Sequence, residues 1–328
     1  LLILVCLIML LLPASNYASL DVKNNPEIKQ NTMPRWCSFV MIFQVAIVYF
    51  FATLAKFYPG WLDGSFTKLI LSNTEFEVFK KLFTQHWFHL FIAYSGIAFD
   101  MLIIPLLLWK RTRTIAFLSA VFFHLFNAIF LQIGIFPFFA LSFIVFFYPP
   151  EKIRSIFFRK KIPVEYAAPI AQNKAALLYF FLPFFIIQLI LPIRHHFIKG
   201  DVLWTEEGHR LSWRMMLRQR QGYATFRVID KKSQTEIPYD YLKKLNQKQQ
   251  AFVASNPDGI WQMAQIIKKE FAQKGTDVSV FVNAEASING GKYNKLVNPE
   301  TDMATAKWDY FVHNDWILLY DAQGNILK

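Results

Sequence analysis

Cysteine is nearly absent from this sequence, with only Cys6 and Cys37 among 328 residues. Both lie inside apolar stretches, so a structural disulfide between domains is not expected. The sequence also lacks an internal repeat, a glycine-rich loop for phosphate, a Cys or His cluster at zinc-binding spacing and a recognisable Ser-His-Asp order. These absences argue against the commonest classes of soluble enzyme.

Charged residues are also scarce, at 18% of the chain, against about a quarter in an ordinary soluble domain. Hydrophobic residues make up 54% and aromatic residues 17%. This balance predicts a membrane protein. Much of the net charge of +12 flanks apolar runs, which is typical of charge that sets membrane topology and not of a nucleic-acid binder.

Several apolar runs could cross a bilayer core, which takes about 20 residues of helix. The candidate spans are 1–12, 36–55, 87–109, 114–133, 135–148 and 175–193. The first run opens at Leu1 with no basic segment before it. We therefore interpret it as the end of a helix whose start is missing, and not as a signal peptide. Gly134 and Pro137 break the helix between 114–133 and 135–148, which predicts a kinked pair, a hairpin or a half-span.

Two short basic segments predict which side of the membrane each loop faces. KRTR at 110–113 and EKIRSIFFRKK at 151–161 should face the cytoplasm by the positive-inside rule. The 56–85 loop and everything after the 175–193 helix then lie on the opposite side. Lys56 and the C-terminal domain are therefore expected on the same, non-cytoplasmic face.

The composition turns soluble after the last apolar run. We expect a multi-helix transmembrane domain over 1–193 and an outward-facing α+β domain over 194–328. Residues 222–230 and 276–290 have strand character, the second ending in an Asn-Gly turn, and 258–275 have helical spacing. The predicted fold class is a polytopic α-helical membrane domain followed by an α+β soluble domain.

Lys56 has only uncharged neighbours in FFATLAKFYPGW, residues 50–61. One interpretation is that its stem lies in lipid while its ammonium snorkels to the headgroups. The other is burial among aromatic side chains, which would favour the neutral amine and make Lys56 a general base. The aromatic neighbours concerned are Phe50, Phe51, Phe57, Tyr58 and Trp61.

Polar side chains interrupt the later apolar runs. Asp100 lies well inside the 87–109 run. His124 and Asn127 share a face of the next helix, with Gln132 about a turn or so further on. Such residues often hydrogen-bond one helix to another. They could also line a pocket for a ligand that enters from the lipid, and the spacing leaves both interpretations open.

Basic residues gather after the last apolar run, in LPIRHHFIKG (191–200) and LSWRMMLRQRQ (211–221). They could be interfacial residues that bind lipid headgroups. As a group on the side of Lys56, they could also receive an acidic substrate, because arginine pairs with carboxylates in bidentate fashion. The residues concerned are His195, His196, Arg214, Arg218 and Arg220.

Five segments, in order along the chain, resemble vitamin K-dependent gamma-glutamyl carboxylase and its bacterial relatives. They are AKFYPGW, FFHLFNAIFLQIGIFPF, LPIRHHF, LSWRMM and ASINGGKYNKLVNPETDMA. The resemblance implies a membrane enzyme that oxygenates reduced vitamin K, phylloquinol or menaquinol, and uses the energy to carboxylate the gamma carbon of glutamate, consuming CO2 and O2. It also implies two partners, a glutamate-containing peptide or protein and membrane lipid, and no nucleic acid.

The resemblance also implies residue roles. Lys56 matches the family lysine that deprotonates the hydroquinone, although vertebrate enzymes have two adjacent lysines where this chain has Ala55 and Lys56. A further family histidine would lie upstream of Leu1. His124 and His195 fall on family histidines, and Arg220 on a family arginine. We therefore expect Lys56 to be catalytic and no metal to be bound; Arg220, Arg218 and His195 to bind substrate; and His124, Asn127 and Asp100 to line a quinone pocket.

Two other functions fit the same residues. One is a membrane quinone or lipid oxidoreductase of the same fold that does not carboxylate. The other is a non-enzymatic membrane protein in which Lys56 only snorkels. A fold alone does not decide among such functions.

Overall fold

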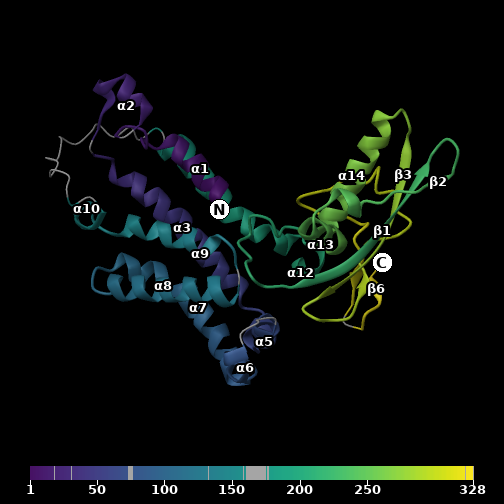
Figure 1. Cartoon of the computed structure of the whole chain (residues 1–328), viewed down its shortest axis with the longest axis horizontal. Coiled ribbons are helices and arrows are strands. Elements are labelled where there is room, and N and C mark those ends of the chain that lie inside the picture. The colour runs from purple at the N-terminus through teal and green to yellow at the C-terminus, as the bar shows by residue number, and fades with distance from the viewer. Residues whose placement is uncertain are drawn as a thin grey trace. The chain divides into compact units, whose positions relative to one another are not determined.

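The structure is a computed structural model of the whole chain, which folds into two compact units, Leu1–Leu189 and Ile190–Lys328. The first unit is helical and the second combines helices with sheets (Figure 1). The predicted fold class is confirmed. The residues described are 1–17, 19–30, 32–72, 77–131, 133–157, 159, 175, 177–321 and 323–327.

Two sequence-based expectations fall wholly or partly outside these residues. Gln132 is not among them, and the basic segment 151–161 is described only in part.

The first unit is built almost entirely from helices. Its α-helices are α1 (Leu2–Leu11), α2 (Leu20–Asn24), α3 (Arg35–Ala55), α4 (Pro59–Leu62), α5 (Ser65–Ser72), α6 (Lys80–Phe83), α7 (His86–Leu108), α8 (Arg113–Phe130), α9 (Phe136–Ser142) and α10 (Pro150–Phe157). Its 3-10 turns are η1 (Pro26–Ile28), η2 (Glu77–Phe79) and η3 (Phe143–Phe147). The π-helical turn η4 (Leu177–Phe181) leads into α11 (Leu182–Ile190).

Within the described residues, four helical stretches are long and apolar enough to cross a membrane. They are Arg35–Ala55, His86–Leu108, Arg113–Phe130 and Leu177–Phe197. The first of these, α3, is the most deeply packed: 61% of its apolar window is buried, against 33% or less for the others. It packs on α7 and η3, and α7 also packs on α8.

The predicted interruption near Gly134 and Pro137 is present. Helix α8 ends at Phe130, Gly134 adopts a φ of +65°, and α9 begins at Phe136 with Pro137 in its first turn. Proline is tolerated there because the first N–H groups of a helix have no partner inside it. The chain therefore turns here and starts a second, shorter helical segment.

The second unit is an antiparallel sheet covered by two helices. Its strands are β1 (Arg220–Asp230), β2 (Glu236–Ile237), β3 (Val278–Ile288), β4 (Asn294–Lys295), β5 (Leu319–Tyr320) and β6 (Ile326–Leu327). Its helices are η5 (Leu191–Phe197), α12 (Val202–Thr205), η6 (Leu242–Lys244), α13 (Gln247–Ser255) and α14 (Pro257–Gln273).

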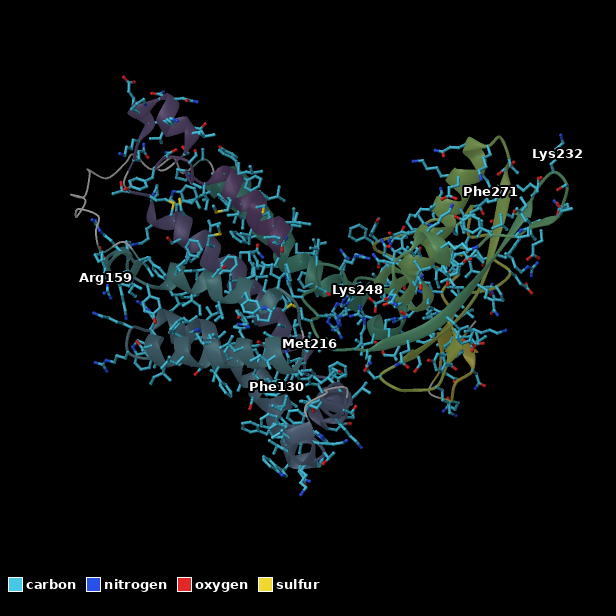
Figure 2. The ribbon with its side chains drawn as sticks, in the orientation of Figure 1. Phe130, Arg159, Met216, Lys232, Lys248 and Phe271 are labelled. Carbon is cyan, nitrogen blue, oxygen red and sulfur yellow. The ribbon has the colours of Figure 1, made fainter. Side chains whose placement is uncertain are left out.

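The main sheet has the strand order β2-β1-β3-β4, and β1 and β3 pair along their whole length, from Arg220 opposite Ile288 to Asp230 opposite Val278. Every second residue of β3 from Val278 to Ala286 is buried against α13 and α14, as the period of two requires. The two helices lie beside the long strands (Figure 1), while Lys232 projects from the turn between β1 and β2 (Figure 2).

Candidate active site

Lys56 is a buried, paired residue at the C-terminal end of α3. Its Nζ forms an ion pair with Oδ2 of Asp100 on α7 and lies 3.4 Å from the carbonyl oxygen of Ala52. The two charged side chains are 8% and 7% exposed. The ammonium group therefore points into the helical unit and not outwards, as a snorkelling lysine would.

The surroundings of Lys56 differ from the sequence-based expectation. Phe50 and Phe57 are 55% and 57% exposed, so they do not bury it. Trp61 does, because its ring centroid lies 5.4 Å from Nζ of Lys56. A carboxylate and an indole, and not a cage of phenylalanines, surround the amine.

Gly96 on α7 lies beside Trp61 and Lys56, and a Cβ there would be at ordinary contact distance from both. Gly96 lies one helical turn before Asp100, on the same face. A side chain at Gly96 would meet Trp61 at 3.4 Å and Cε of Lys56 at 3.9 Å. Helix α7 also holds Trp61 by a hydrogen bond, because the indole N–H donates to the carbonyl oxygen of Ala93 at 2.9 Å.

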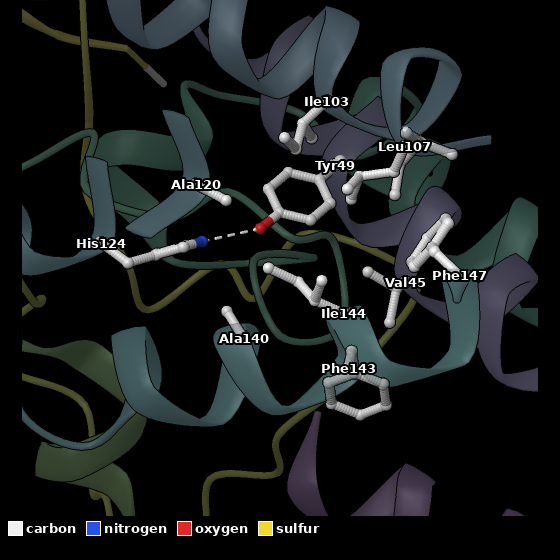
Figure 3. A pocket seen from close by; sticks show the side chains of 11 residues that line it. Val45, Tyr49, Ile103, Leu107, Ala120, His124, Ala140, Phe143, Ile144 and Phe147 are labelled. Atoms are coloured by element: carbon white, nitrogen blue, oxygen red, sulfur yellow. Dashed lines mark hydrogen bonds between the residues drawn. The ribbon is translucent and has the colours of Figure 1, made fainter. Parts of the chain in front are cut away.

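An apolar cavity lies further along the same pair of helices (Figure 3). It is lined by Val45, Tyr49, Ile103, Ile104, Leu107, Ala120, His124, Ala140, Phe143, Ile144 and Phe147. The polar side chains in its wall are Tyr49 and His124. Oη of Tyr49 and Nε2 of His124 are hydrogen-bonded at 3.0 Å. Nδ1 of the same imidazole is buried and has no hydrogen-bond partner among the described residues.

The ion pair and the cavity belong to one seam between α3 and α7. Tyr49 precedes Lys56 by seven residues, about 10 Å along the helix and two turns on the same face. On α7, Ile103 and Leu107 continue the face that carries Asp100. The seam thus has a charged pair at one end and an apolar cavity with a Tyr-His pair further along.

Of the three residues expected to line a quinone pocket, the structure places only His124 in the wall of the cavity. Asp100 pairs with Lys56 instead. Asn127 is buried one turn beyond His124 on α8 and is not among the residues that line the cavity.

The second unit contains a separate cluster of charged residues around Glu206. This carboxylate accepts from Arg218 and, at 3.3 Å, from Nη1 of Arg220. Burial raises the pKa of Glu206, although Arg218 and Arg220 oppose the shift. Burial also lowers the pKa of Arg220 to about 10.

Arg220 donates hydrogen bonds to the backbone of two other segments of the second unit. Its side chain is 5% exposed. Nε donates to the carbonyl oxygen of Ser255 at 2.8 Å, and Nη1 donates to those of Leu203 and Trp204 at 2.6 and 3.0 Å. Only Nη2 is left without a partner among the described residues.

His195 has a defined tautomer. Nη1 of Arg214 lies 3.2 Å from Nε2 of His195 and can only donate, so Nε2 accepts. Nδ1 must then carry the proton, and it donates to the carbonyl oxygen of Pro192 at 2.8 Å. The ring is therefore neutral and fixed at both nitrogens.

His209 lies in the most positive part of this cluster. Burial lowers its pKa to about 3, and the charges of Arg218, Arg214, Arg210 and Arg220 add to the shift. Nδ1 of His209 and Nε of Arg218 are buried without a partner in the described structure. The cluster therefore has more positive charge and more N–H groups than its own carboxylates, Glu206 and Asp258, satisfy.

Sequence reasoning missed three residues of these clusters. Tyr49 gave no signal, because it is one tyrosine in a chain with 13 Tyr and 35 Phe. Glu206 and Asp258 did carry a signal, since acidic residues close to a group of arginines usually pair with them. Among the described residues, no group of three or more His, Cys, Asp or Glu could hold a metal ion.

Comparison with known families gives a match to each part of the chain. Residues 1–151 match the family model described as the HTTM domain, and these include Tyr49, Lys56, Asp100 and His124. Residues 173–323 match the model described as the vitamin K-dependent gamma-carboxylase lumenal domain, and these include His195, Arg218 and Arg220. No solved structure matches the chain.

Proposed function

The two matches place this chain in the vitamin K-dependent gamma-glutamyl carboxylase family, and on this premise we propose that it couples oxygenation of reduced vitamin K to carboxylation of glutamate. The observation that carries the proposal is the buried Lys56–Asp100 pair, which lies in one seam with the apolar cavity. A membrane enzyme with a lumenal domain is the general class that the family implies. We propose that this domain lies on the non-cytoplasmic side.

The lining of the cavity has the chemistry that a quinol needs. It is apolar apart from Tyr49 and His124, and a buried imidazole nitrogen has no partner in the described protein. The space itself, about 10 Å³, holds no more than one water, so the helices around it have to part before a hydroquinone ring can pack on this lining and a hydroxyl group can bond to that nitrogen. When bound, reduced vitamin K supplies, with O2, the strong base that glutamate carboxylation needs.

The Lys56–Asp100 pair can take up a proton as a unit. The pair is neutral overall, and because burial disfavours charge its shared proton can pass from the ammonium of Lys56 to the carboxylate of Asp100, which frees the lysine amine. The amine can then accept one proton, which gives a protonated lysine beside a protonated aspartic acid. The pair then carries one positive charge in a dry site, where it stabilises an anion next to it. In this scheme Lys56 is the base. Asp100 holds the proton that would otherwise occupy the lysine amine.

Lys56→Arg is the deciding test. Arginine can keep the ion pair with Asp100 but stays protonated, so it cannot act as the base. We expect the variant to insert and to lose vitamin K epoxide formation, measured with purified protein and vitamin K hydroquinone. Lys110→Arg, at an exposed site, is the matched control and should keep its activity. If Lys56→Arg retains most of the epoxidation rate, Lys56 is not the base.

We propose that the basic cluster of the second unit receives the glutamate carboxylate. In the part of the chain that the structure describes, Arg218 and Arg220 each keep one buried N–H group without a partner, Nε and Nη2 respectively, and His195 lies in the same unit. Arg218→Gln should raise the KM for a glutamate peptide about ten- to hundredfold, for one lost charge-assisted hydrogen bond. The KM for the quinol should not change; equal losses on both substrates would indicate a folding defect.

A quinone or lipid oxidoreductase without carboxylation is the second candidate. The observation that favours it is that Lys56, Asp100, Tyr49 and His124 all belong to the first unit. The same incubation, with labelled bicarbonate and a glutamate peptide, distinguishes the two. Epoxide without incorporated label would support the oxidoreductase, and label in the peptide would support the carboxylase.

A further inference from the structure

A short loop of the second unit displays three consecutive large apolar side chains. Tyr310, Phe311 and Val312 are 57%, 65% and 57% exposed. A water-soluble surface usually scatters such residues singly, so a contiguous group indicates a contact with something apolar.

The loop holds its shape by polar contacts at its base. The backbone N–H of Asp309 donates to Oδ1 of Asn314 at 2.7 Å, and Nδ2 of Asn314 donates to the carbonyl oxygen of Asp309 at 3.1 Å. Oδ1 of Asp309 accepts from the N–H groups of Phe311 and Val312, at 2.7 and 3.0 Å. Two backbone donors of the tip are thus already satisfied, which lowers the cost of taking them out of water.

The base of the loop is fixed to Glu207, which is 2% exposed. Oε1 of Glu207 accepts from the backbone N–H and from Nδ2 of Asn314, both at 2.7 Å. Oε2 lies 2.7 Å from Nδ1 of His313. The two residues after the exposed tip are therefore fixed to Glu207, and Asp309 before it is held through Asn314.

Glu207 is itself attached to the end of the last candidate span. The next residue, Gly208, packs so closely on His195 that a Cβ at this position would lie 2.8 Å from Cβ of His195. His195 belongs to the stretch Leu177–Phe197, which is long and apolar enough to cross a membrane. At the end of that stretch Phe197 is 83% exposed. The loop is thus tied, through Glu207 and Gly208, to the place where the chain leaves the bilayer.

We propose that residues 310–312, the aromatic tip, insert into the headgroup region of the bilayer and form a second membrane contact of this domain. Tyrosine and phenylalanine suit this region, since tyrosine has an apolar ring and a polar hydroxyl. Lys307, exposed and three residues before the tip, can reach lipid phosphates. The tip is linked through Glu207 and Gly208 to the end of the candidate span at His195, and the contact does not depend on the proposed catalytic activity.

Site-directed spin labelling of the full chain in vesicles of phosphatidylcholine and phosphatidylglycerol tests the proposal. Cys6 and Cys37 are first replaced by alanine, and one cysteine at Phe311 then carries a nitroxide. The matched control is the same label at Lys232, an exposed residue in the β1–β2 turn. We expect oxygen to relax the label at 311 more strongly than a water-soluble nickel chelate does, and the reverse at 232.

Two results would overturn the proposal. If the label at 311 is as accessible to the nickel chelate as the label at 232, the tip lies in water. If it is shielded from both oxygen and nickel, the tip packs on protein and not on lipid. Asp309→Ala provides a second measurement, because it removes the acceptor of the tip N–H groups and should move the label at 311 towards water.

Discussion

At the scale of single residues, Lys56 and Asp100 depend on each other. Taking an isolated charge out of water is costly, and a pair is tolerated only when both partners remain. Each residue alone is uncommon in an apolar helix, and together they form a neutral unit. A loss of activity in a Lys56 variant therefore has to be separated from the effect of leaving Asp100 unpaired.

A double-mutant cycle separates the two effects. Lys56→Met and Asp100→Leu, each alone, should destabilise the helical unit by up to about 3–5 kcal/mol, because each leaves a buried charge without its partner. The double variant should recover much of this loss. Thermal unfolding of the detergent-solubilised protein measures all four species. If the losses of the two single variants simply add in the double variant, Lys56 and Asp100 do not stabilise each other.

The lowered pKa of His209 predicts that the stability of the second unit depends on pH. Burial, then the neighbouring arginines, lower its pKa to about 3, while in the unfolded chain a histidine titrates near 6.5. Between these values the unfolded state binds more protons, so stability should fall as the pH drops from about 6.5 towards 3, by at most about 1.4 kcal/mol per pH unit. The raised pKa of Glu206 contributes a slope of opposite sign above its unfolded value.

The substitution His209→Gln removes the contribution of this histidine to the pH dependence of stability. Hydrogen exchange of the β1 and β3 amides, measured in the wild type and the variant, reports the opening free energy of this unit. We expect a flatter dependence on pH below about 6.5 in the variant. Identical slopes would mean that His209 is not buried in its neutral form.

At the scale of elements, one glycine allows the segment after α12 to pack closely on η5. Gly208 has a φ of +69°, and a side chain there would come within 2.9 Å of Cα and 3.1 Å of N of His195. These are backbone atoms, which cannot move aside as the end of a flexible side chain can. The close packing of 206–209 on η5 therefore requires glycine.

Gly208→Ala should destabilise the second unit more than Gly275→Ala. Gly275 has a similar φ, +77°, but nothing lies within 4 Å of where its Cβ would be. Both substitutions carry the left-handed backbone cost of about 1–2 kcal/mol, and only the first adds a collision. The difference in opening free energy, again by hydrogen exchange, measures that collision. Equal effects would show that the segment does not pack on His195.

The long helices and strands were predictable, whereas the partners of the charged residues were not. Candidate spans follow from the length of apolar runs, and β3 from its alternating pattern, because both are local properties. Lys56 and Asp100 are 44 residues apart, and their contact depends on how α3 and α7 rotate against each other. Nothing in the sequence indicated that Arg220, at the start of β1, donates to the carbonyls of Leu203, Trp204 and Ser255.

At the scale of the whole molecule, the basic loops determine the expected orientation in the membrane. Lys110, Arg111 and Arg113 lie between or beside the ends of α7 and α8, and positively charged loops of this kind stay in the cytoplasm. Residues before α7 then lie on the other side. Helix α8 leads the chain back to that side, so the shorter apolar segment Phe136–Phe147 has to return it to the cytoplasm. A crossing by Leu177–Phe197 would then bring the second unit to the non-cytoplasmic side as well.

Single-cysteine labelling tests this orientation in sealed cells or vesicles of known sidedness. With Cys6 and Cys37 replaced by alanine, cysteines are placed at three exposed residues: Ser72 before α7, Lys248 on α13 and Lys110 in the basic loop. An impermeant thiol reagent applied from the non-cytoplasmic side should modify the positions at 72 and 248 and leave 110 unmodified until the membrane is opened.

Because α7 alone separates 72 from 110, modification of both from one side would mean that α7 does not cross the membrane. Modification of 72 but not of 248 would instead leave Lys56, the proposed base, and the basic cluster on opposite sides of the bilayer. The proposed coupling of quinol oxygenation to glutamate carboxylation would then fail.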